Sequence, residues 1–377
     1  MKTAFPKVAF GSTLLDRGLE SGGLDGIGQY CQELLNQYSL SSAEINIQPF
    51  SFGVNKSHCS ATVLPSYTNY LANSFLSTNQ ETAARRFFAA VDLVHATDQL
   101  IPVRHNKPMV STVMDTIPLS HPQYIRSHSR YLKPFLWKKL TQQSDHIITI
   151  SEFSKNEISR LMNFPAEKIT SIPLGVDSRY FEKIDKEEIQ NTLNRFSIHT
   201  PFLLFIGSIQ PRKNLLRILK AHASLPQKLA TEYPLVIAGK LAWDDGQILK
   251  EIQKGVEEKR CVWLNYISDF EKRCLLQASQ GMVFASLYEG FGLPILEAFA
   301  SNVPVITSTC TSMPEVAGDA ALMVDPNNEE SIRNGMQTLI NNSSLLESLK
   351  LRGLAHAKKF TWERVAKDTS NVYSSLL

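Results

Sequence analysis

Residues 282–300, MVFASLYEGFGLPILEAFA, contain the pattern from which the fold follows. The run Met282–Ala285 is short, continuous and apolar, which is typical of a strand buried on both faces. Two glycines come next, and Pro294 suits the first turn of a helix that continues through Ile295–Ala300. The stretch therefore predicts one strand–loop–helix unit of a parallel sheet, with its glycine loop at the carboxyl end of the strand.

The same alternation of apolar runs and amphipathic stretches continues along the chain. The other predicted strands are Val8–Leu15, Leu93–Ala96, Met109–Val113, His146–Ile150, Lys168–Ile172, Phe202–Ile206, Leu235–Ala238, Val262–Leu264 and Val303–Thr307. The predicted helices between them include Ile27–Gln37, Ser154–Asn163, Lys213–Ser224, Gln247–Lys259 and Phe270–Gln280. Because parallel strands need crossover helices, and these cover both faces of a sheet, we predict an α/β fold with doubly wound sheets.

The length and composition indicate two globular domains. A chain of 377 residues is too long for one compact domain, and its 43% hydrophobic and 20% charged residues exclude a disordered chain, a collagen-like fibre and a coiled coil. No apolar run approaches the length of a transmembrane helix, and the first residues do not resemble a signal peptide. A strand ends near Pro173–Asp177, which predicts a hinge between residues 1–178 and residues 179–358.

Charge and cysteine usage exclude further classes. The formal net charge of +3 is too small for a dedicated nucleic-acid-binding protein. The five cysteines form no CxxC pair, so free thiols in a reducing cytoplasm are expected.

One stretch departs from this even charge balance. Residues 121–141 contain no acidic residue but carry Arg126, Arg130, Lys133, Lys138 and Lys139 together with Tyr131, Phe135, Leu136 and Trp137. A basic face with aromatic side chains suits the surface of an anionic membrane. The alternative is that the aromatic side chains pack into the core of the domain.

The glycine loop that follows Met282–Ala285 is the first candidate for a binding site. Ligands of parallel sheets bind beyond the carboxyl ends of the strands, and Gly290 and Gly292 allow close approach of the backbone. A carboxylate in the loop, Glu289, can accept hydrogen bonds from sugar hydroxyls, and Glu297 in the helix can accept them from a ribose diol. The alternative is a solvated turn with two surface acids.

A second candidate follows the predicted strand Phe202–Ile206. Gly207 and Ser208 end that strand, and Arg212 and Lys213 lie where the next helix begins. Two adjacent cations can neutralise a diphosphate without a metal, although two exposed cations at a helix start are also common without any function. The stretch lacks the second glycine and the hydroxyl residue of a Walker A loop.

The N-terminal half contains weaker candidates. Gly26 and Gly28 lie in a glycine-rich loop before a helix, but Cys31 stands where a dinucleotide fingerprint needs its third glycine, so a plain loop is the alternative. Asp115 follows a buried strand and points to the same kind of crevice. His95 lies at the end of another strand, where a hydrogen-bonded structural histidine is the alternative. No Asp-x-Asp and no metal-ligand spacing occurs in the sequence, so neither a metal nor another cofactor is expected.

Together these motifs resemble the signature of the retaining glycosyltransferases of family 4, which have the two-domain GT-B fold. The resemblance rests on Glu289–Glu297 around Gly-Phe-Gly-Leu-Pro, and on Gly207-Ser-x-x-x-Arg212-Lys213-Asn214, Tyr266–Asp269, Ser151–Ser154 and Pro173–Asp177, in the family's order from about residue 20 to the end. It implies two Rossmann-like domains facing across a cleft. It also implies that a last helix, within residues 359–377, returns to the first domain.

The resemblance implies a role for each matching residue. Arg212, Lys213, Glu289 and Asp115 would be catalytic, with the two cations on the donor diphosphate. Contacts to the donor would come from Gly207, Ser208, Ile267, Gly290, Phe291, Gly292, Leu293 and Glu297. The acceptor side would include Gly26, Gly28 and His95. One position departs from the family: Met114 stands where a histidine is usual, so Asp115, with His95, would have to cover that position.

A narrower resemblance concerns the substrate. Leu93–Asp98 and Met114–Pro122 look most like mannosyltransferases of lipopolysaccharide O-chain synthesis. This implies transfer of a hexose, mannose from GDP-mannose as the first expectation, to a lipid-linked glycan acceptor for O-antigen. Such an enzyme would act in the cytoplasm, at the inner face of the cytoplasmic membrane, without binding nucleic acid. The alternatives are a GT-B sugar-phosphate synthase with a small soluble acceptor and a catalytically inert sugar-nucleotide-binding subunit.

Overall fold

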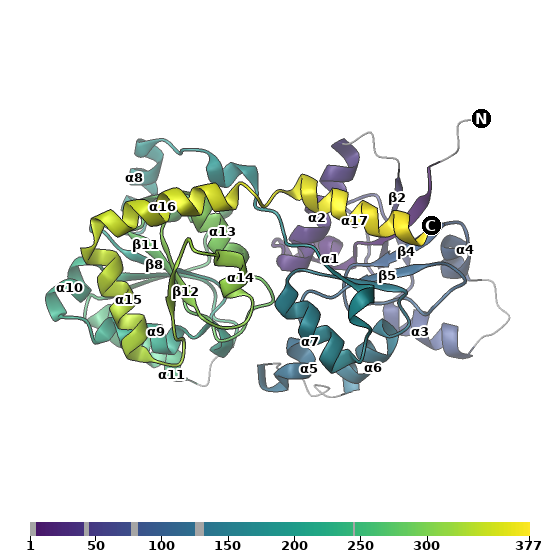
Figure 1. The fold of residues 1–377 in the computed structure, drawn as a ribbon, viewed down its shortest axis with the longest axis horizontal. Coiled ribbons are helices and arrows are strands. Elements are labelled where there is room, and N and C mark those ends of the chain that lie inside the picture. Colours follow the sequence, from purple (N-terminus) through teal and green to yellow (C-terminus); the bar gives the residue numbers. More distant parts are fainter. Residues whose placement is uncertain (1–4, 41–44, 77–81, 125–131, 244–245) are drawn as a thin grey trace. The chain divides into compact units, whose positions relative to one another are not determined.

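The computed structural model describes residues 5–40, 45–76, 82–124, 132–243 and 246–377. The chain divides into two compact units. Unit 1 comprises Met1–Gly175 together with Trp362–Leu377, and unit 2 comprises Val176–Thr361. The sequence analysis placed these boundaries three residues away, after residue 178 and after residue 358. Figure 1 shows the elements of both units.

Unit 1 is built on a sheet of seven parallel strands in the order β3-β2-β1-β4-β5-β6-β7. The strands are β1 (Lys7–Gly11), β2 (Asn46–Phe52), β3 (Thr62–Leu64), β4 (Leu93–Ala96), β5 (Met109–Thr112), β6 (His146–Thr149) and β7 (Ile169–Ser171). In register, Val8 pairs with Leu93. The central strands β4 and β5 are buried along their whole length, as expected when helices cover both faces.

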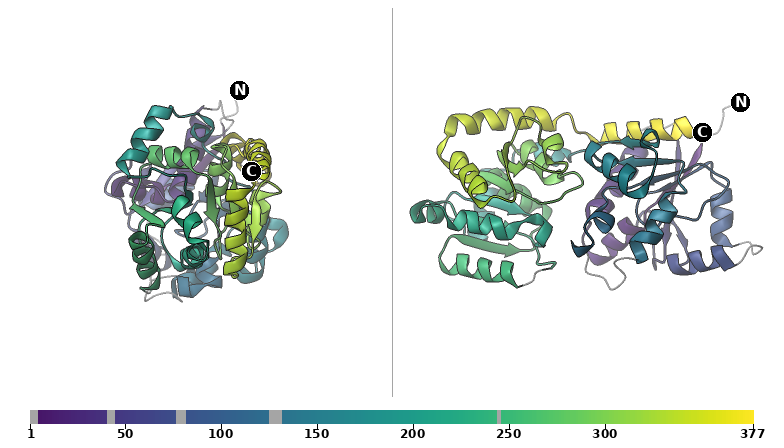
Figure 2. Two further views of the ribbon diagram at one scale, coloured as in Figure 1. Left: turned by 90° about the vertical axis from the view of Figure 1, so that its left-hand side faces the viewer. Right: turned by 60° about the horizontal axis from the view of Figure 1, so that its bottom comes forward.

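Helices cover both faces of this sheet (Figure 2). They are α1 (Thr13–Ser21), α2 (Gly26–Leu40), α3 (Tyr67–Leu76), α4 (Ala83–Ala89), α5 (Ile117–Ser120), α6 (Leu132–Thr141), α7 (Glu152–Met162) and α17 (Trp362–Leu376). A core on one face joins the sheet to side chains of α3, α4, α6 and α7. The C-terminal helix α17 lies along α2, where the Tyr38 hydroxyl donates to the Ala366 carbonyl and Trp362 packs against Tyr30.

Unit 2 repeats the plan with six parallel strands in the order β10-β9-β8-β11-β12-β13. They are β8 (Leu203–Ile206), β9 (Leu235–Ala238), β10 (Cys261–Asn265), β11 (Gly281–Phe284), β12 (Val305–Ser308) and β13 (Leu322–Val324). The helices are α8 (Lys186–Arg195), α9 (Leu215–Ala223), α10 (Gln227–Glu232), α11 (Gln247–Glu257), α12 (Asp269–Ala278), α13 (Leu293–Ala300), α14 (Met313–Ala317), α15 (Glu329–Asn341) and α16 (Ser343–Ala357). The core on one face contains side chains of α9, α10, α11 and α15.

The strand order places a candidate site in each unit. In both sheets the chain builds outward from a first strand and then crosses to that strand's other side. This topological switch lies between β1 and β4 in unit 1, and between β8 and β11 in unit 2. Loops that leave two such strands diverge and open a crevice at the carboxyl edge of the sheet.

The predicted fold class is confirmed, because both units are doubly wound parallel α/β structures. Element boundaries differ at the N-terminus, where Val8–Leu15 was predicted as one strand. Strand β1 ends at Gly11, and the apolar residues that follow belong to α1, whose Leu15 is buried. An apolar run by itself does not show where a strand gives way to a buried helix. Strands β2, β3 and β13 were not predicted.

Among the residues that the structure describes, no helix is long and apolar enough to cross a membrane.

Candidate functional site

The two loops at the switch point of unit 2 bring together the residues predicted to be catalytic on the donor side. Arg212 and Lys213 lie in a short 3-10 helix (η4, Pro211–Lys213) after β8, and Glu289 lies in the loop between β11 and α13. Asn214, with a φ of 60°, ends the 3-10 helix. Its side-chain amide donates to the carbonyls of Ala285 (2.9 Å) and Pro326 (2.7 Å), which ties the first loop to the second.

The three charged side chains form a nearly enclosed cluster. Lys213 Nζ lies 2.6 Å from Glu289 Oε1, and Arg212 Nη1 donates to Glu289 Oε2 at 2.8 Å. The side chains of Lys213 and Glu289 are only 9% and 10% exposed. The Lys213 ammonium also lies 4.8 Å from the centroid of the Phe284 ring, close enough for a cation–π interaction. Because two cations face one carboxylate, the cluster has an excess of one positive charge.

Burial and neighbouring charges both shift the protonation of this cluster. Burial acts to raise the pKa of Glu289, but the charges of Lys213 and Arg212 outweigh it and hold the pKa below its ordinary value. Burial lowers the pKa of Lys213, and its ion pair with Glu289 offsets only part of that effect. The Glu289 carboxylate is therefore held in its charged form by the cations it contacts.

The end of β8 favours glycine at two positions, at Gly207 because of its positive φ and at Gly239 because of a close backbone contact. Gly207 has a φ of +143°, and a Cβ there would lie 3.6 Å from Lys213 Cε. Behind it, a Cβ on Gly239 would lie 1.9 Å from the Gly207 carbonyl oxygen, so only glycine fits at position 239. The neighbouring Ser208 is exposed, and its hydroxyl accepts a hydrogen bond from Gln210.

A buried serine holds the loop that carries Glu289. Ser312 is fully buried, and its hydroxyl lies within hydrogen-bond distance of the carbonyls of Glu289 (2.9 Å) and Phe291 (2.8 Å). Gly292, with a φ of +112°, then turns the chain into α13, which begins at the half-buried Leu293. The predicted donor residues Gly290 and Phe291 lie buried in this loop. The conformation of this irregular loop is therefore fixed by the contacts of its carbonyls with the buried Ser312 hydroxyl.

Glu297 and Ile267, predicted to contact the ribose and the base, belong to the same unit. Glu297 lies on α13 with a side chain that is 5% exposed, and its Oε1 accepts a hydrogen bond from Lys272 at 2.8 Å. Ile267 is half-buried in the turn between β10 and α12. The predicted donor residues therefore all lie in unit 2.

The residues predicted for the acceptor side lie in unit 1 and have different surroundings. Gly26 is exposed at the start of α2, and Gly28 is buried, with its amide donating to Asp25 Oδ1. Asp115 is half-buried and accepts a hydrogen bond from the amide of Ile117 at the start of α5. Arg126, Arg130 and Tyr131 of the basic stretch lie outside the described residues.

His95 is a hydrogen-bonded structural histidine, which was the alternative considered from the sequence. The residue is fully buried, and hydrogen bonds join its Nδ1 to the Tyr373 hydroxyl (2.6 Å) and its Nε2 to the Thr112 hydroxyl (2.8 Å). Burial lowers the pKa of His95 to about 3, so the ring is neutral. Since both ring nitrogens are used inside the core, this corrects the expectation that His95 faces an acceptor.

Asp98 lies at the switch point of unit 1, two residues beyond β4, and was not among the predicted site residues. It is 6% exposed, and its Oδ1 accepts a hydrogen bond from the Leu100 amide at 2.7 Å. Burial raises its pKa to about 6, while that hydrogen bond and the charge of Arg17 act in the opposite direction. An acid that titrates near neutral pH at such an edge is a candidate for function.

Three other residues that support the site were also not predicted: Asn214, Ser312 and Lys272. Asn214 was quoted within a motif, but only its left-handed backbone and its two carbonyl partners show what it does. Ser312 belongs to a segment without a glycine or charge pattern, and Lys272 is one of four charged residues in Asp269–Arg273, with nothing local to distinguish it. Their contacts join residues far apart in the sequence, so no local signal was available for them.

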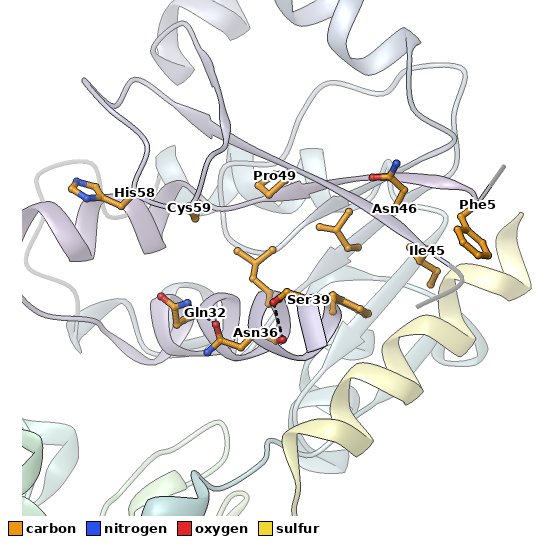
Figure 3. A pocket seen from close by; sticks show the side chains of 12 residues that line it. Phe5, Gln32, Asn36, Ser39, Ile45, Asn46, Pro49, His58 and Cys59 are labelled. Atoms are coloured by element: carbon orange, nitrogen blue, oxygen red, sulfur yellow. Dashed lines mark hydrogen bonds between the residues drawn. The ribbon is translucent and has the colours of Figure 1, made fainter. Parts of the chain in front are cut away.

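A separate hollow of about 550 Å³ lies between α2 and β2 of unit 1. Figure 3 shows its mixed lining, with the polar Gln32 and Asn36 on α2 and the apolar Ile45 and Pro49 on the side of β2. None of the predicted site residues lines it. Within the described parts of the chain, no group of three or more His, Cys, Asp or Glu side chains could hold a metal ion.

Comparisons with protein families agree with this architecture. The family model "Glycosyltransferase Family 4" matches residues 26–180, and the model "Glycosyl transferases group 1" matches residues 186–355. The chain is 35% identical over 286 residues to O-antigen chain mannosyltransferase B of Escherichia coli, covering 75% of this chain and 74% of that protein. It is 28% identical to the serotype-specific mannosyltransferase WbdA of Escherichia coli, but spans only 33% of its length.

Solved structures share the whole fold at low identity. The Anabaena protein Alr3699/HepE, in complex with UDP and glucose, superposes with a TM-score of 0.76 over 98% of this chain and all of that one, at 16% identity. Sucrose-phosphate synthase from Thermosynechococcus elongatus superposes with a TM-score of 0.73 over 98% of this chain and 99% of that one, at 18% identity. These likenesses show that the chain has the GT-B fold.

The raised pKa of Asp98 predicts a pH dependence of stability. An aspartate in an unfolded chain has a pKa of about 3.9, so the folded state binds the Asp98 proton more tightly. The stability that this provides is present in full below about pH 4 and is lost as the pH rises through about 6. Relative to Asp98→Asn, the wild type should therefore lose about 3 kcal/mol of unfolding free energy between pH 4 and pH 7, as measured by urea unfolding. An identical pH dependence in both proteins would contradict this expectation.

Proposed function

The chain belongs to glycosyltransferase family 4, and we propose that it transfers mannose from GDP-mannose to a lipid-linked glycan acceptor in O-antigen synthesis. The enzyme class follows from the family. The sugar and the pathway are supported by the relatives, because the E. coli proteins named above are mannosyltransferases and one is named for the O-antigen chain. The observation that carries the proposal is the enclosed cluster of Arg212, Lys213 and Glu289 at the switch point of unit 2.

The cluster suits a nucleotide sugar whose diphosphate leaves. Its surplus positive charge lies at the carboxyl edge of the sheet, where an anion compensates it. As the bond between the anomeric carbon and the diphosphate oxygen breaks, negative charge grows on the β-phosphate, and Arg212 and Lys213 stabilise it without having to move into place. Arg212 offers a planar fork of donors and Lys213 a point charge.

Glu289 suits the transferred sugar. Its Oε1 is buried and paired with Lys213 Nζ at 2.6 Å, and its Oε2 accepts from Arg212 at 2.8 Å. Each carboxylate oxygen can accept more than one hydrogen bond, so a sugar hydroxyl can donate to Glu289 while both cations stay in contact with it. Glu289 thus orders the two cations and contacts the sugar with the same carboxylate.

The chemical step that we propose retains the configuration at the anomeric carbon. The acceptor oxygen bonds to that carbon on the face from which the diphosphate departs, and its proton passes to the departing β-phosphate oxygen. No protein nucleophile and no metal takes part in this step. With His95 held in the core, Asp115 remains the proposed catalytic residue on the acceptor side.

The two alternatives have less support. A sugar-phosphate synthase shares the fold, but the likeness to sucrose-phosphate synthase at 18% identity shows the fold alone. An inert sugar-nucleotide-binding subunit would need the same cluster to bind the diphosphate, but the E. coli relatives are named as transferases.

We propose that a face of α6 brings the protein to an anionic membrane, where it would meet its lipid-linked acceptor at the cytoplasmic side. Leu132, Phe135 and Leu136 lie at helical spacing with exposures of 71%, 58% and 40%, and Lys133 and Lys139 are exposed beside them. Apolar side chains flanked by lysines fit the boundary between lipid head groups and acyl chains.

The structure narrows the face that the sequence predicted. Trp137 is 5% exposed and packs into the core of unit 1, so it is unavailable to a membrane. Lys138 donates from Nζ to the Leu161 carbonyl at 2.7 Å, which ties it to α7. In the described part of α6, the lysines that remain for the proposed membrane face are therefore Lys133 and Lys139.

Lys213→Ala should reduce mannose transfer by about 10²–10³-fold, as loss of one preorganised electrostatic donor typically does. Transfer is measured as mannose incorporated from GDP-mannose into lipid-linked glycan, with UDP-glucose as the competing donor. Lys220→Ala is the matched control, because that exposed lysine of the same unit pairs only at 4.0 Å with Glu329. If Lys213→Ala keeps activity within a few-fold of wild type, Lys213 does not stabilise the departing diphosphate.

Transfer should also continue in excess EDTA, because the proposed step uses Arg212 and Lys213 where other enzymes use a divalent cation. The rate is compared with and without chelator, and again after Mg²⁺ or Mn²⁺ is restored. Complete loss on chelation, with recovery on metal addition, would show that the donor chemistry is different.

The protein should sediment with vesicles of phosphatidylserine and phosphatidylcholine at low salt, and less with phosphatidylcholine alone. Lys133→Glu/Lys139→Glu should weaken this binding because each nearby lysine contributes about 1 kcal/mol. Leu132→Ser/Phe135→Ser should weaken it because less apolar surface enters the lipid. Lys7→Glu/Lys168→Glu makes the same charge change at exposed positions outside α6 and should bind like wild type. Equal recovery in the supernatant with both vesicle types would exclude the docking face.

A further inference from the structure

A lysine on α12 contacts the carboxylate that is predicted to bind the donor ribose. Lys272 Nζ donates to Glu297 Oε1 at 2.8 Å. The Glu297 side chain is 5% exposed and that of Lys272 is 21% exposed, so this pair is largely removed from water. A carboxylate so enclosed is stable only with a cation or several donors beside it.

The ammonium of Lys272 has a defined position of its own. It lies 5.0 Å from the centroid of the Tyr180 ring, and 3.9 Å from Asp269 Oδ1. The Tyr180 hydroxyl donates to that same Asp269 oxygen at 3.0 Å. The Tyr180 ring and the Asp269 carboxylate thus restrict the position of the ammonium that contacts Glu297.

The same lysine joins Glu297 to the turn predicted to meet the base. Helix α12 begins at Asp269, directly after Ile267 and Ser268, and a capping box between Ser268 and Glu271 fixes its first turn. Lys272 is in that first turn. The carboxylate on α13 and the turn before α12 are therefore connected through one side chain, although they are far apart in the sequence.

We propose that Lys272 is a positioning residue for nucleotide recognition, which aims the Glu297 carboxylate at the ribose hydroxyls of the donor. The inference rests on the proposed function, which supplies the nucleotide donor, and on the ribose contact that the resemblance implies for Glu297. By holding Oε1, the lysine fixes the rotation of the carboxylate and so the directions in which it accepts hydrogen bonds. Without the lysine, the carboxylate would lose its nearest cation and turn away from the ribose.

The test compares affinities for a nucleoside diphosphate and for its 2′,3′-dideoxy counterpart, which lacks both ribose hydroxyls. Isothermal titration calorimetry gives the two dissociation constants with GDP and dideoxy-GDP, or with the UDP pair if the wild type binds UDP more tightly. The wild type should bind the ribose form about tenfold or more tightly, because hydrogen bonds to charged groups are strong. Lys272→Met should reduce that ratio to within about threefold of unity.

Two further variants separate positioning from simple loss of structure. Lys272→Arg keeps a cation in reach and should restore part of the ratio. Lys220→Met removes an exposed lysine of the same unit and should leave the ratio unchanged. A general loss of folded protein would weaken both ligands alike and would not change the ratio.

Each outcome decides the inference. A wild-type ratio in Lys272→Met overturns it, as does a wild type that binds both forms equally. Neither result affects the proposed function, which is judged separately by mannose transfer in the wild type. If Lys272→Met does not fold, the ratio in Lys272→Arg and Lys272→Gln decides, and equality of both with wild type overturns the inference.

Discussion

Removing the Glu289 carboxylate from water is favourable only because Lys213 and Arg212 stand 2.6 and 2.8 Å from it. Neither cation could be buried there alone, so the three side chains depend on one another. The cluster still holds one positive charge more than it neutralises. That surplus is the physical reason why this edge of unit 2 is suited to an anion, and it exists before any ligand arrives.

The two loops that carry this cluster are held in place by uncharged residues of unit 2. Gly239 allows the end of β8 to pass close to it, Asn214 ties the two loops together, and Ser312 holds the Glu289 loop by its carbonyls. Each of these side chains is buried or absent, so none competes with a ligand. The cost of ordering the loops is met by these contacts during folding and not during binding.

Unit 1 uses its polar side chains differently. His95, Tyr373 and Thr112 form a hydrogen-bonded group inside the core, and this group joins the C-terminal helix α17 to the sheet. In the same unit Asp98 is buried at the switch point, and α6 has an exposed apolar face flanked by lysines. The polar side chains of unit 1 thus lie mainly in its interior, and its exposed apolar and basic side chains lie on an outer helix.

The local pattern of the sequence was sufficient for the fold class, because buried parallel strands and amphipathic crossover helices have different periods that can be recognised one element at a time. Charged residues beside glycines at strand ends are also a local feature, so the sequence marked Arg212, Lys213 and Glu289 as candidates, and the structure brings their side chains together. The local pattern was not sufficient for His95, whose partners Thr112 and Tyr373 come from β5 and α17. Nor did it select Asp98, Ser312 or Lys272, whose roles depend on burial or on residues distant in the chain. Burial and long-range hydrogen bonds arise only when the sheet and its helices assemble, so only the tertiary structure could decide which polar residues serve the core and which serve the site.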